Sequence, residues 1–201
     1  MQGQSPLPIA GEGEDHDDAT VISSGSGFVR CTRARNDEYG TAYFRKVIPM
    51  PSAIIRPART DEYNAIAGVW MNSWTSTGLE DASDVLLAKL RARIPIEVAK
   101  GWSLFVADDR GQLAAMLALH LPQFYLDQLF VAPEYQGQNL GRRLLAFSRQ
   151  QLPDEIWLRC VRENEKTWRW YEREGFVFEK EAVEPMTGLV MKYYRWKRTT
   201  P

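Results

Sequence analysis

The sequence predicts an α/β fold in which a mixed sheet carries helices on both faces. Two observations support this prediction. Hydrophobic side chains recur at helical spacing in some segments and form short strand-like runs in others. The two kinds of segment alternate in the order β-α-α-β-β-β-α-β-α-β-β. This alternation predicts one sheet with the intervening helices packed against it.

The overall composition excludes several classes of protein. The chain has 201 residues, of which 44% are hydrophobic and 25% charged, and its net charge is −1. A net charge near zero gives no electrostatic reason to expect a nucleic acid or an anionic membrane as the main partner. Two cysteines, Cys31 and Cys160, and two histidines, His16 and His120, do not match a disulfide framework or a metal-ligand set. We therefore expect no metal. No apolar run approaches the length of a membrane span, so we expect a cytoplasmic protein.

The first part of the chain differs in composition from the rest. Residues 3–27 are dominated by Gly, Ser, Pro and acidic side chains, which cannot bury enough apolar surface to offset the entropy of ordering. We expect residues 1–52 to be an N-terminal extension, disordered or loosely docked, and residues 53–201 to be the folded domain. An alternative is that Met50 is the natural start of the protein.

The first elements of the domain are a strand and two helices. A short strand is expected at residues 54–56. Asp61 can cap the following helix, because its carboxylate can accept a hydrogen bond from a free N–H group. A second helical pattern runs from about Ser83 through Val98, and Pro95 within it should kink or split the helix.

The remainder of the chain adds strands and two more helices. Residues 103–107 and 113–121 flank a turn and should pair as an antiparallel hairpin. The further segments with strand patterns are 125–131, 156–161, 176–179 and 189–196. The further segments with helical patterns are a helix starting at about Asn139 and a helix over 164–174.

A loop with glycines joins the strand at 125–131 to the helix that follows. The N–H groups at the start of a helix lie at its positive dipole end and suit an anion such as a pyrophosphate. Gly137 and Gly141 let a ligand approach the backbone closely, and Arg142 and Arg143 could add positive charge. The loop matches neither a P-loop nor a dinucleotide fingerprint. A loop that needs glycine only for tight helix–strand packing is the alternative explanation.

A second segment places polar and aromatic groups on one helix face. Asn164, Trp168 and Tyr171 stand at positions i, i+4 and i+7, so they share a face that extends roughly 10 Å along the axis. Two structural explanations compete with a functional one. Asn164 can serve as an N-cap, and Tyr171 can be a core residue with its hydroxyl at the surface.

Together the two segments resemble the GNAT (Gcn5-related) N-acetyltransferase superfamily. The cofactor loop of that family reads Gln/Arg-x-x-Gly-x-Gly/Ala and corresponds here to residues 136–141. Its following helix often reads Asn-x-x-Ala-x-x-(apolar)-Tyr-Glu-Lys-x-Gly-Phe and corresponds here to residues 164–176. The resemblance covers about Ile54 to Trp196. It implies the GNAT fold, a mixed, mostly antiparallel central sheet of about six to seven strands flanked by about four helices.

The resemblance also implies an activity. An acetyl-CoA-dependent N-acetyltransferase would move the acetyl group to a primary amine of a small molecule or peptide, which attacks the thioester directly. A protein N-terminal or lysine acetyltransferase is one alternative, and a non-catalytic acyl-CoA-binding interaction module is another. No nucleic acid or membrane partner is expected. Dimers are common among relatives, so a homodimer is one expectation.

The family pattern assigns roles to particular residues. Tyr171 would be the general acid beside the sulfur, and Asn164 would hydrogen-bond the pantetheine. The backbone of three strand residues would pair with the pantetheine arm: Leu129, Phe130 and Val131. The loop and the helix start would hold the pyrophosphate: Gln136, Gly137, Gln138, Asn139, Leu140, Gly141 and Arg142.

Two departures from the family pattern concern the loop and the base. Asn139 stands where the family usually has glycine, although asparagine tolerates left-handed conformations. Arg159 stands where some protein-acetylating members have a glutamate base. Asp127 is therefore the first candidate for the base, followed by Glu134, His120 or a water chain. Asp127 is equally explained as a solvated charge at the end of a strand.

Aromatic side chains are the candidates for an amine pocket. Trp70, Trp74 and Tyr125 could line it, although tryptophans in such positions are more often part of the core. The family places acceptor specificity in segments that correspond to residues 70–95 and 182–188.

Overall fold

The computed structural model describes residues 52–78, 84–185 and 187–199. Contacts divide the chain into two units, Met1–Pro49 and Met50–Pro201. Every described residue belongs to the second unit. The expectation of an extension over residues 1–52 therefore concerns residues that, apart from Ser52, lie outside the described part of the chain.

A seven-stranded sheet in the order β1-β2-β3-β4-β5-β7-β6 forms the centre of this unit. The strands β4 and β5 are parallel, and the other neighbours pair antiparallel. The sheet is therefore mixed and mostly antiparallel, as the resemblance implied. The bounds are β1 (Ile54–Pro57), β2 (Ser103–Asp109), β3 (Gln112–His120), β4 (Tyr125–Val131), β5 (Glu155–Val161), β6 (Val177–Val183) and β7 (Val190–Lys197).

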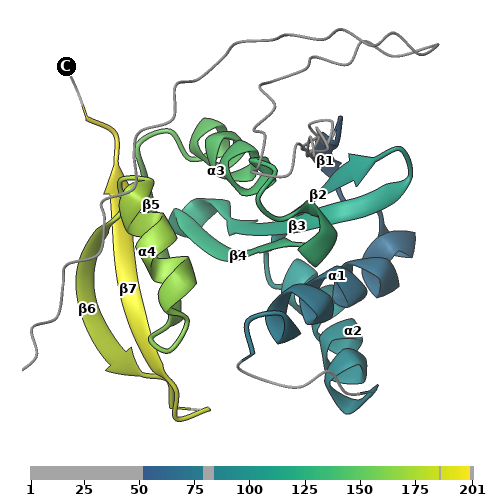
Figure 1. Ribbon diagram of the computed structural model, residues 1–201, viewed down its shortest axis with the longest axis horizontal. Helices are drawn as coiled ribbons and strands as arrows, with labels where there is room; N and C mark the ends of the chain where they lie inside the picture. Colours follow the sequence, from purple (N-terminus) through teal and green to yellow (C-terminus); the bar gives the residue numbers. More distant parts are fainter. Residues whose placement is uncertain (1–51, 79–83, 186, 200–201) are drawn as a thin grey trace, which may run out of the picture. The chain divides into compact units, whose positions relative to one another are not determined.

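The junction between β4 and β5 divides the sheet into two groups of strands. Only two residue pairs join these strands, Tyr125 with Trp157 and Leu126 with Leu158. Beyond them, β1–β4 and β5–β7 run in markedly different directions (Figure 1). Within the described part of the chain, the backbone of β4 after Leu126 therefore has no partner strand on its β5 side.

A β-bulge bends β4 at the same place. Ala118 pairs with Gln128 and Leu119 pairs with Leu126, so Asp127 is an extra residue without a partner in the register. Such a bulge interrupts the ladder and redirects a side chain. Here the redirected side chain is that of Asp127.

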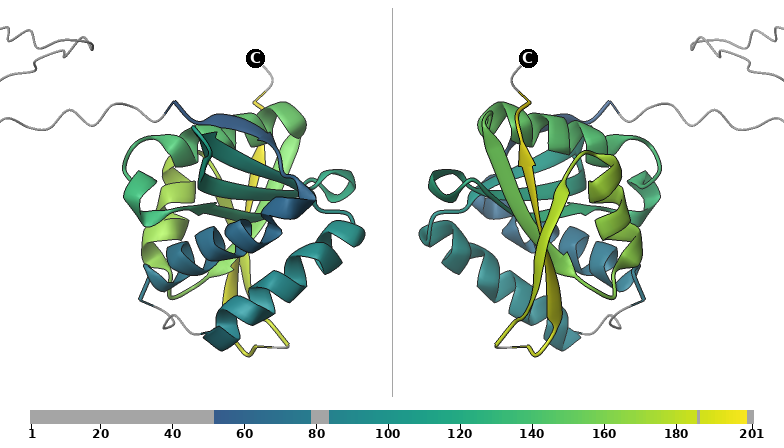
Figure 2. Two further views of the ribbon diagram at one scale, coloured as in Figure 1. Left: turned by 90° about the vertical axis from the view of Figure 1, so that its right-hand side faces the viewer. Right: turned by 90° about the vertical axis from the view of Figure 1, so that its left-hand side faces the viewer.

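Four α-helices cover the two faces of the sheet (Figure 2). One core contains side chains of α3 and α4 together with Leu117 and Leu119 of β3. The other contains side chains of α1 and α2 together with Met116 and Ala118. Because neighbouring residues of a strand point to opposite faces, the two helix pairs lie on opposite sides of the sheet. The bounds are α1 (Tyr63–Thr75), α2 (Asp84–Ala99), α3 (Leu140–Gln151) and α4 (Glu165–Arg173).

Two expectations for the first helices were wrong, namely that Pro95 splits the second helix and that Asp61 caps the first. Pro95 does not split α2, which continues through it to Ala99. A proline removes one hydrogen bond, and here the fully buried Ile94 anchors the helix beside it while Pro95 itself faces solvent. Asp61 does not cap α1 but lies in the 3-10 helix η1 (Thr60–Glu62). The carboxylate of Glu62 instead accepts a hydrogen bond from the backbone N–H of Arg59, at 2.8 Å.

An arginine explains why Glu62 turns inward. Arg56 Nη2 lies 2.6 Å from Glu62 Oε1 and 2.7 Å from Asp108 Oδ2, so it joins β1, η1 and β2. Its hydrogen bonds hold the pKa of both carboxyl groups below their usual values. The start of α1 is thus tied to the edge of the sheet.

The strand β6 is longer than its sequence pattern indicated. It runs from Val177 to Val183, whereas a strand at 176–179 was expected. All but one of its residues are exposed, so no alternation of apolar and polar side chains marks its length.

Candidate active site

The loop between β4 and α3 contains two left-handed residues. After the 3-10 helix η3 (Pro133–Tyr135), Gly137 has φ 73° and Asn139 has φ 64°. Glycine adopts this conformation freely and asparagine more readily than most residues. The departure from the family pattern at Asn139 is therefore compatible with the backbone that the loop adopts.

The first turn of α3 presents free backbone N–H groups. Arg143 N donates to Asn139 O at 3.2 Å, so the N–H groups of Leu140, Gly141 and Arg142 precede the first helical hydrogen bond. Together with the helix dipole they favour an anion. A Cβ atom added to Gly141 would lie 3.5 Å from Trp170 Cζ2, an ordinary contact. Tight packing of the helix alone therefore does not require glycine at this position.

The side chains of the loop hold its shape. Gln136 Nε2 donates to Val131 O at 3.0 Å, and Gln138 Nε2 donates to Glu134 O at 2.6 Å. Arg142 is paired with Glu174 of the α4 C-terminus at 2.6 Å. Since these side chains have protein partners, the ligand-binding groups that the loop offers are chiefly its backbone N–H groups.

The direction of the β4 backbone corrects one expectation. Ala132 N donates to Ala114 O at 2.9 Å, and backbone groups alternate in direction along an antiparallel strand. Those of Phe130 therefore face β3, while those of Leu129 and Val131 face away from it. Phe130 contributes its ring instead, which stacks on Trp70 with 5.7 Å between centroids.

Asn164 caps α4, as the structural explanation proposed. Its Oδ1 accepts a hydrogen bond from Thr167 N at 3.3 Å. The amide nitrogen Nδ2, at the other end of the same group, is a donor that a ligand can use. The capping role and a ligand-binding role are therefore compatible.

Tyr171 is a core residue. It is 5% exposed and packs against Phe176. Burial raises its pKa far above the usual value, and it raises the pKa of the neighbouring Cys160 thiol to about 12. Among the described residues, none forms a hydrogen bond with the Tyr171 hydroxyl. It is thus a protonated donor available to a ligand.

The bulge residue Asp127 is not a solvated strand-end charge. Its side chain is 10% exposed and accepts hydrogen bonds from Trp102 Nε1 at 2.7 Å and from Gln128 Nε2 at 2.8 Å. The hydroxyl of Tyr125 lies 3.3 Å from the same carboxylate. His120 Nε2 lies 3.5 Å from Asp127 Oδ2.

Arg159 joins this group from β5. Its Nε donates to the Tyr125 hydroxyl at 3.2 Å, and its guanidinium forms an ion pair with Glu184. We refer to Trp102, His120, Tyr125, Asp127 and Arg159 as the bulge cluster. The sequence analysis named four of its members separately but missed Trp102. This residue directly precedes β2, and nothing in its sequence position indicates that its indole N–H donates to Asp127.

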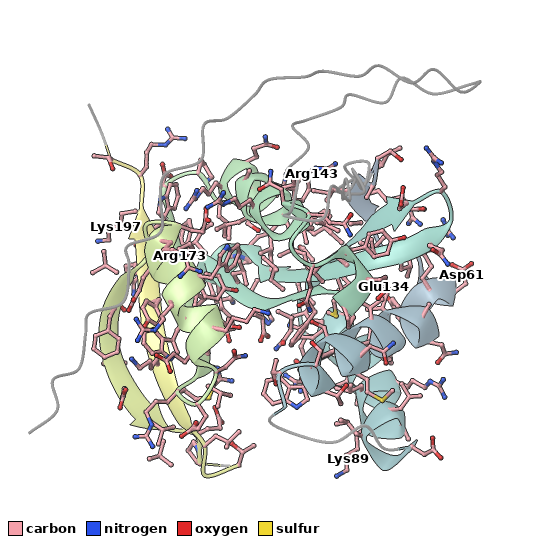
Figure 3. All side chains as sticks on the ribbon, viewed as in Figure 1. Asp61, Lys89, Glu134, Arg143, Arg173 and Lys197 are labelled. Atoms are coloured by element: carbon pink, nitrogen blue, oxygen red, sulfur yellow. The ribbon has the colours of Figure 1, made fainter. Side chains whose placement is uncertain are left out.

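The candidates for the base differ in their surroundings. Because Asp127 already accepts several hydrogen bonds, few of its lone pairs remain for a substrate proton. His120 lies beside this carboxylate, and a neutral imidazole keeps one ring nitrogen as an acceptor. Glu134 lies in the connection between β4 and α3, where it is exposed and outside the bulge cluster (Figure 3). Arg143, which could have added positive charge to the loop, instead donates a hydrogen bond to Ala53 O and so anchors α3 to the start of β1.

The expected aromatic residues divide between core and site. Trp70 is 5% exposed and packs against Trp102 and Phe130 in the core of α1 and α2. Trp74 packs against the same core. Tyr125 belongs to the bulge cluster, where its ring stacks on Trp157 with 3.9 Å between centroids.

Searches for other kinds of site give three results. Among the residues that the structure describes, no group of three His, Cys, Asp or Glu side chains could hold a metal ion. None of the described helices has the length and apolar character needed to span a membrane. A cavity of about 460 Å³ near the start of β1 contains none of the candidate site residues.

Comparisons with known proteins agree with this geometry. The model of the acetyltransferase (GNAT) family matches residues 65–176, more than half of the chain. No curated protein matches. The fold is similar to that of a GCN5-related N-acetyltransferase from Rhodopseudomonas palustris, with 15% identity, coverage of 75% of this chain and 99% of that chain, and a TM-score of 0.60.

Two further solved structures were determined with a cofactor. The PaiA N-acetyltransferase from Thermoplasma acidophilum, in complex with coenzyme A, has 17% identity, coverage of 72% and 99%, and a TM-score of 0.60. The acetyltransferase YncA from Salmonella typhimurium, with acetyl-CoA, has 16% identity, coverage of 73% and 94%, and a TM-score of 0.54. At these identities the likeness concerns the fold.

Proposed function

The chain belongs to the acetyltransferase (GNAT) family, and from this premise we propose that it transfers an acetyl group from acetyl-CoA to a primary amine of a small molecule or peptide. The observation that carries the proposal is the position of two groups on one face of the sheet. The first turn of α3, with its free N–H groups, lies against Trp170 of α4. The next residue of α4 is Tyr171, with its buried and protonated hydroxyl.

The residues present fit acetyl-CoA as the donor. The N–H groups of Leu140, Gly141 and Arg142 would hold the pyrophosphate, because they lie at the positive end of α3. The backbone groups of Leu129 and the N–H group of Val131 would pair with the pantetheine arm, since among the described residues β4 has no partner strand there, while the Val131 carbonyl already accepts from Gln136. Acetyl-CoA supplies the acetyl group as an activated thioester.

Tyr171 would act as a proton donor. Burial raises its pKa, so the hydroxyl keeps its proton throughout the physiological range and cannot serve as a base. A hydroxyl held in this way can stabilise the leaving thiolate by donating a hydrogen bond to its sulfur. Its removal would therefore lower the rate of acetyl transfer without removing the contacts that bind the pyrophosphate.

The bulge cluster would receive the proton of the amine. We assign the base to His120 and a supporting role to Asp127, whose carboxylate lies 3.5 Å from His120 Nε2. A negative charge at this distance stabilises the imidazolium that forms when His120 takes up a proton. Asp127 itself is held in place by the indole of Trp102.

The decisive experiment is calorimetric titration of acetyl-CoA into the wild-type protein and into Tyr171→Phe. Both should bind with micromolar affinity, and a screen of amines should find turnover that Tyr171→Phe reduces by about 10²-fold. The matched control is Tyr135→Phe, which removes a hydroxyl from η3. Failure of both proteins to bind at millimolar acetyl-CoA would disprove the cofactor site. Binding without turnover of any amine would favour the acyl-CoA-binding module.

A further inference from the structure

Arg159 occupies a special position in β5. It follows directly after Leu158, the last residue of β5 that pairs with β4. Leu158 and Cys160 on either side of it point into the core of α3 and α4. Arg159 therefore points to the opposite face, which is the face of the bulge cluster.

Aromatic side chains hold the guanidinium in place. Arg159 donates from Nε to the Tyr125 hydroxyl at 3.2 Å, and Tyr193 stands directly opposite it on β7. The rings of Tyr125, Trp157 and Tyr193 stack in succession, with centroid distances of 3.9 and 6.4 Å. The stack holds the Tyr125 ring, whose hydroxyl bonds the Nε end of the guanidinium, while the Nη1 end meets an anion.

The anion that it meets in this structure is a carboxylate of the chain itself. Glu184 lies in the connection between β6 and β7, where its backbone N–H donates to Leu189 O at 2.8 Å. The side chain of Arg159 is 33% exposed and that of Glu184 is 21% exposed. An ion pair with this exposure is weak, so a carboxylate of a ligand can replace Glu184.

The opposite charge lies one hydroxyl group away. The Tyr125 hydroxyl oxygen is 3.2 Å from Arg159 Nε and 3.3 Å from Asp127 Oδ1. A guanidinium and a carboxylate are thus held on the two sides of one oxygen atom. Through its two charges, rather than through a free lone pair of Asp127, this arrangement is complementary to a ligand whose ammonium and carboxylate groups are close together, as they are in an α-amino acid.

We propose that Arg159, with the hydroxyl of Tyr125, forms a carboxylate subsite, and that the acceptor is an amine with a carboxylate close to it, of the α-amino acid class. Glu184 fills the subsite in the absence of the acceptor. The identification of the ligand as the acceptor rests on the proposed acetyltransferase function, whereas the binding of a carboxylate to Arg159 does not.

The test compares amino acids with their decarboxylated amines as ligands. Four matched pairs are titrated into the protein in the presence of coenzyme A: phenylalanine and phenethylamine, leucine and isoamylamine, lysine and cadaverine, and histidine and histamine. In at least one pair the amino acid should bind at least about tenfold more tightly than its amine. Equal binding within every pair, or binding by no member of any pair, would overturn the proposal.

Variants connect this preference to Arg159. Arg159→Met should remove the preference for the amino acid and leave the affinity for the amine unchanged. Glu184→Gln should tighten amino acid binding severalfold, because the competing charge is gone. Lys180→Met is the matched control, since it removes a neighbouring cation that lies over the Tyr193 ring. An equal loss in Arg159→Met and Lys180→Met would indicate a general charge effect and contradict the subsite.

Two further measurements separate the proposal from its premise. If circular dichroism shows that Arg159→Met does not fold, Arg159→Lys replaces it, because lysine retains the positive charge. Arg159→Lys should still weaken amino acid binding, because lysine lacks the planar guanidinium that donates two parallel hydrogen bonds to a carboxylate. Amino acid binding without acetyl transfer would overturn the acetyltransferase function alone. Acetylation of the simple amines with no preference for a carboxylate would overturn the subsite alone.

Discussion

The two sides of the candidate site are built in different ways. On the cofactor side, the groups offered to a ligand are mainly backbone N–H groups of one continuous segment that includes Gly137 and Asn139. In the bulge cluster, they are side chains from separate strands, such as His120 of β3, Asp127 of β4 and Arg159 of β5. The comparison teaches that a backbone site is encoded in a short stretch of sequence, whereas a side-chain site depends on how strands are paired.

The difference also affects how each side responds to mutation. Backbone N–H groups survive most side-chain substitutions, provided that the loop keeps its conformation. A network of buried polar side chains loses more when one member is removed, because its partners are left without hydrogen bonds in a region of low dielectric. Substitutions in the bulge cluster should therefore have the larger effects.

The largest effect is expected for His120→Gln. If His120 is the base, acetyl transfer should fall by about 10²-fold, while acetyl-CoA affinity measured by calorimetry stays within a factor of two to three. Asp127→Asn should lower the rate through His120 and change its pH profile. Glu134→Gln is the control, because this carboxylate is exposed and lies outside the cluster. A drop in Glu134→Gln that equals that in His120→Gln would refute the assignment of the base.

An intermediate effect is expected for Arg56→Gln, which tests how firmly α1 is held over the bulge cluster. The loss of the hydrogen bonds from the Arg56 guanidinium to Glu62 and Asp108 should lower the free energy of unfolding by about 2 kcal/mol at pH 7. Both carboxyl groups have a lowered pKa in the folded state, so their stabilisation is complete above their usual pKa and is lost as the pH falls through the lowered values.

Urea denaturation between pH 7 and pH 3 measures this effect. The difference between wild type and Arg56→Gln should shrink below about pH 4, where the carboxyl groups begin to take up protons. Arg91→Gln, on the exposed side of α2, is the control and should unfold like the wild type. A difference that does not change with pH would mean that Arg56 acts through packing rather than through its ion pairs.

The smallest effect is expected for Asn139→Gly on the cofactor side. Asn139 already has φ 64°, so glycine relieves little strain, and acetyl-CoA affinity should change by less than about threefold. Asn139→Val should lower the free energy of unfolding by roughly 1–2 kcal/mol, since a β-branched residue is strained at positive φ. Thermal unfolding and calorimetry of both variants measure these effects. A tenfold gain in affinity for Asn139→Gly would show that the asparagine side chain obstructs the ligand.

Local pattern was enough for most of the fold and for the glycine-containing connection between β4 and α3. Strand and helix periods predicted seven strands and four helices in the observed order. The loop at 136–141 was predicted because a left-handed residue and a helix start are properties of neighbouring residues. The errors concerned the continuity of α2 at Pro95, the cap at Asp61 and the length of β6, all of which depend on contacts with distant residues or on exposure.

The sequence by itself thus determined the order of the elements, the family resemblance and the backbone groups available at the start of α3, because these follow from residues close together in the chain. Only the tertiary structure decided that Asp127 is the bulge residue of β4, that Trp102 holds it and that Arg159 meets Glu184. Trp102 and Asp127 are 25 residues apart in the chain, as are Arg159 and Glu184. Contacts of this range are fixed by strand register and sheet twist, which no local pattern of side chains specifies.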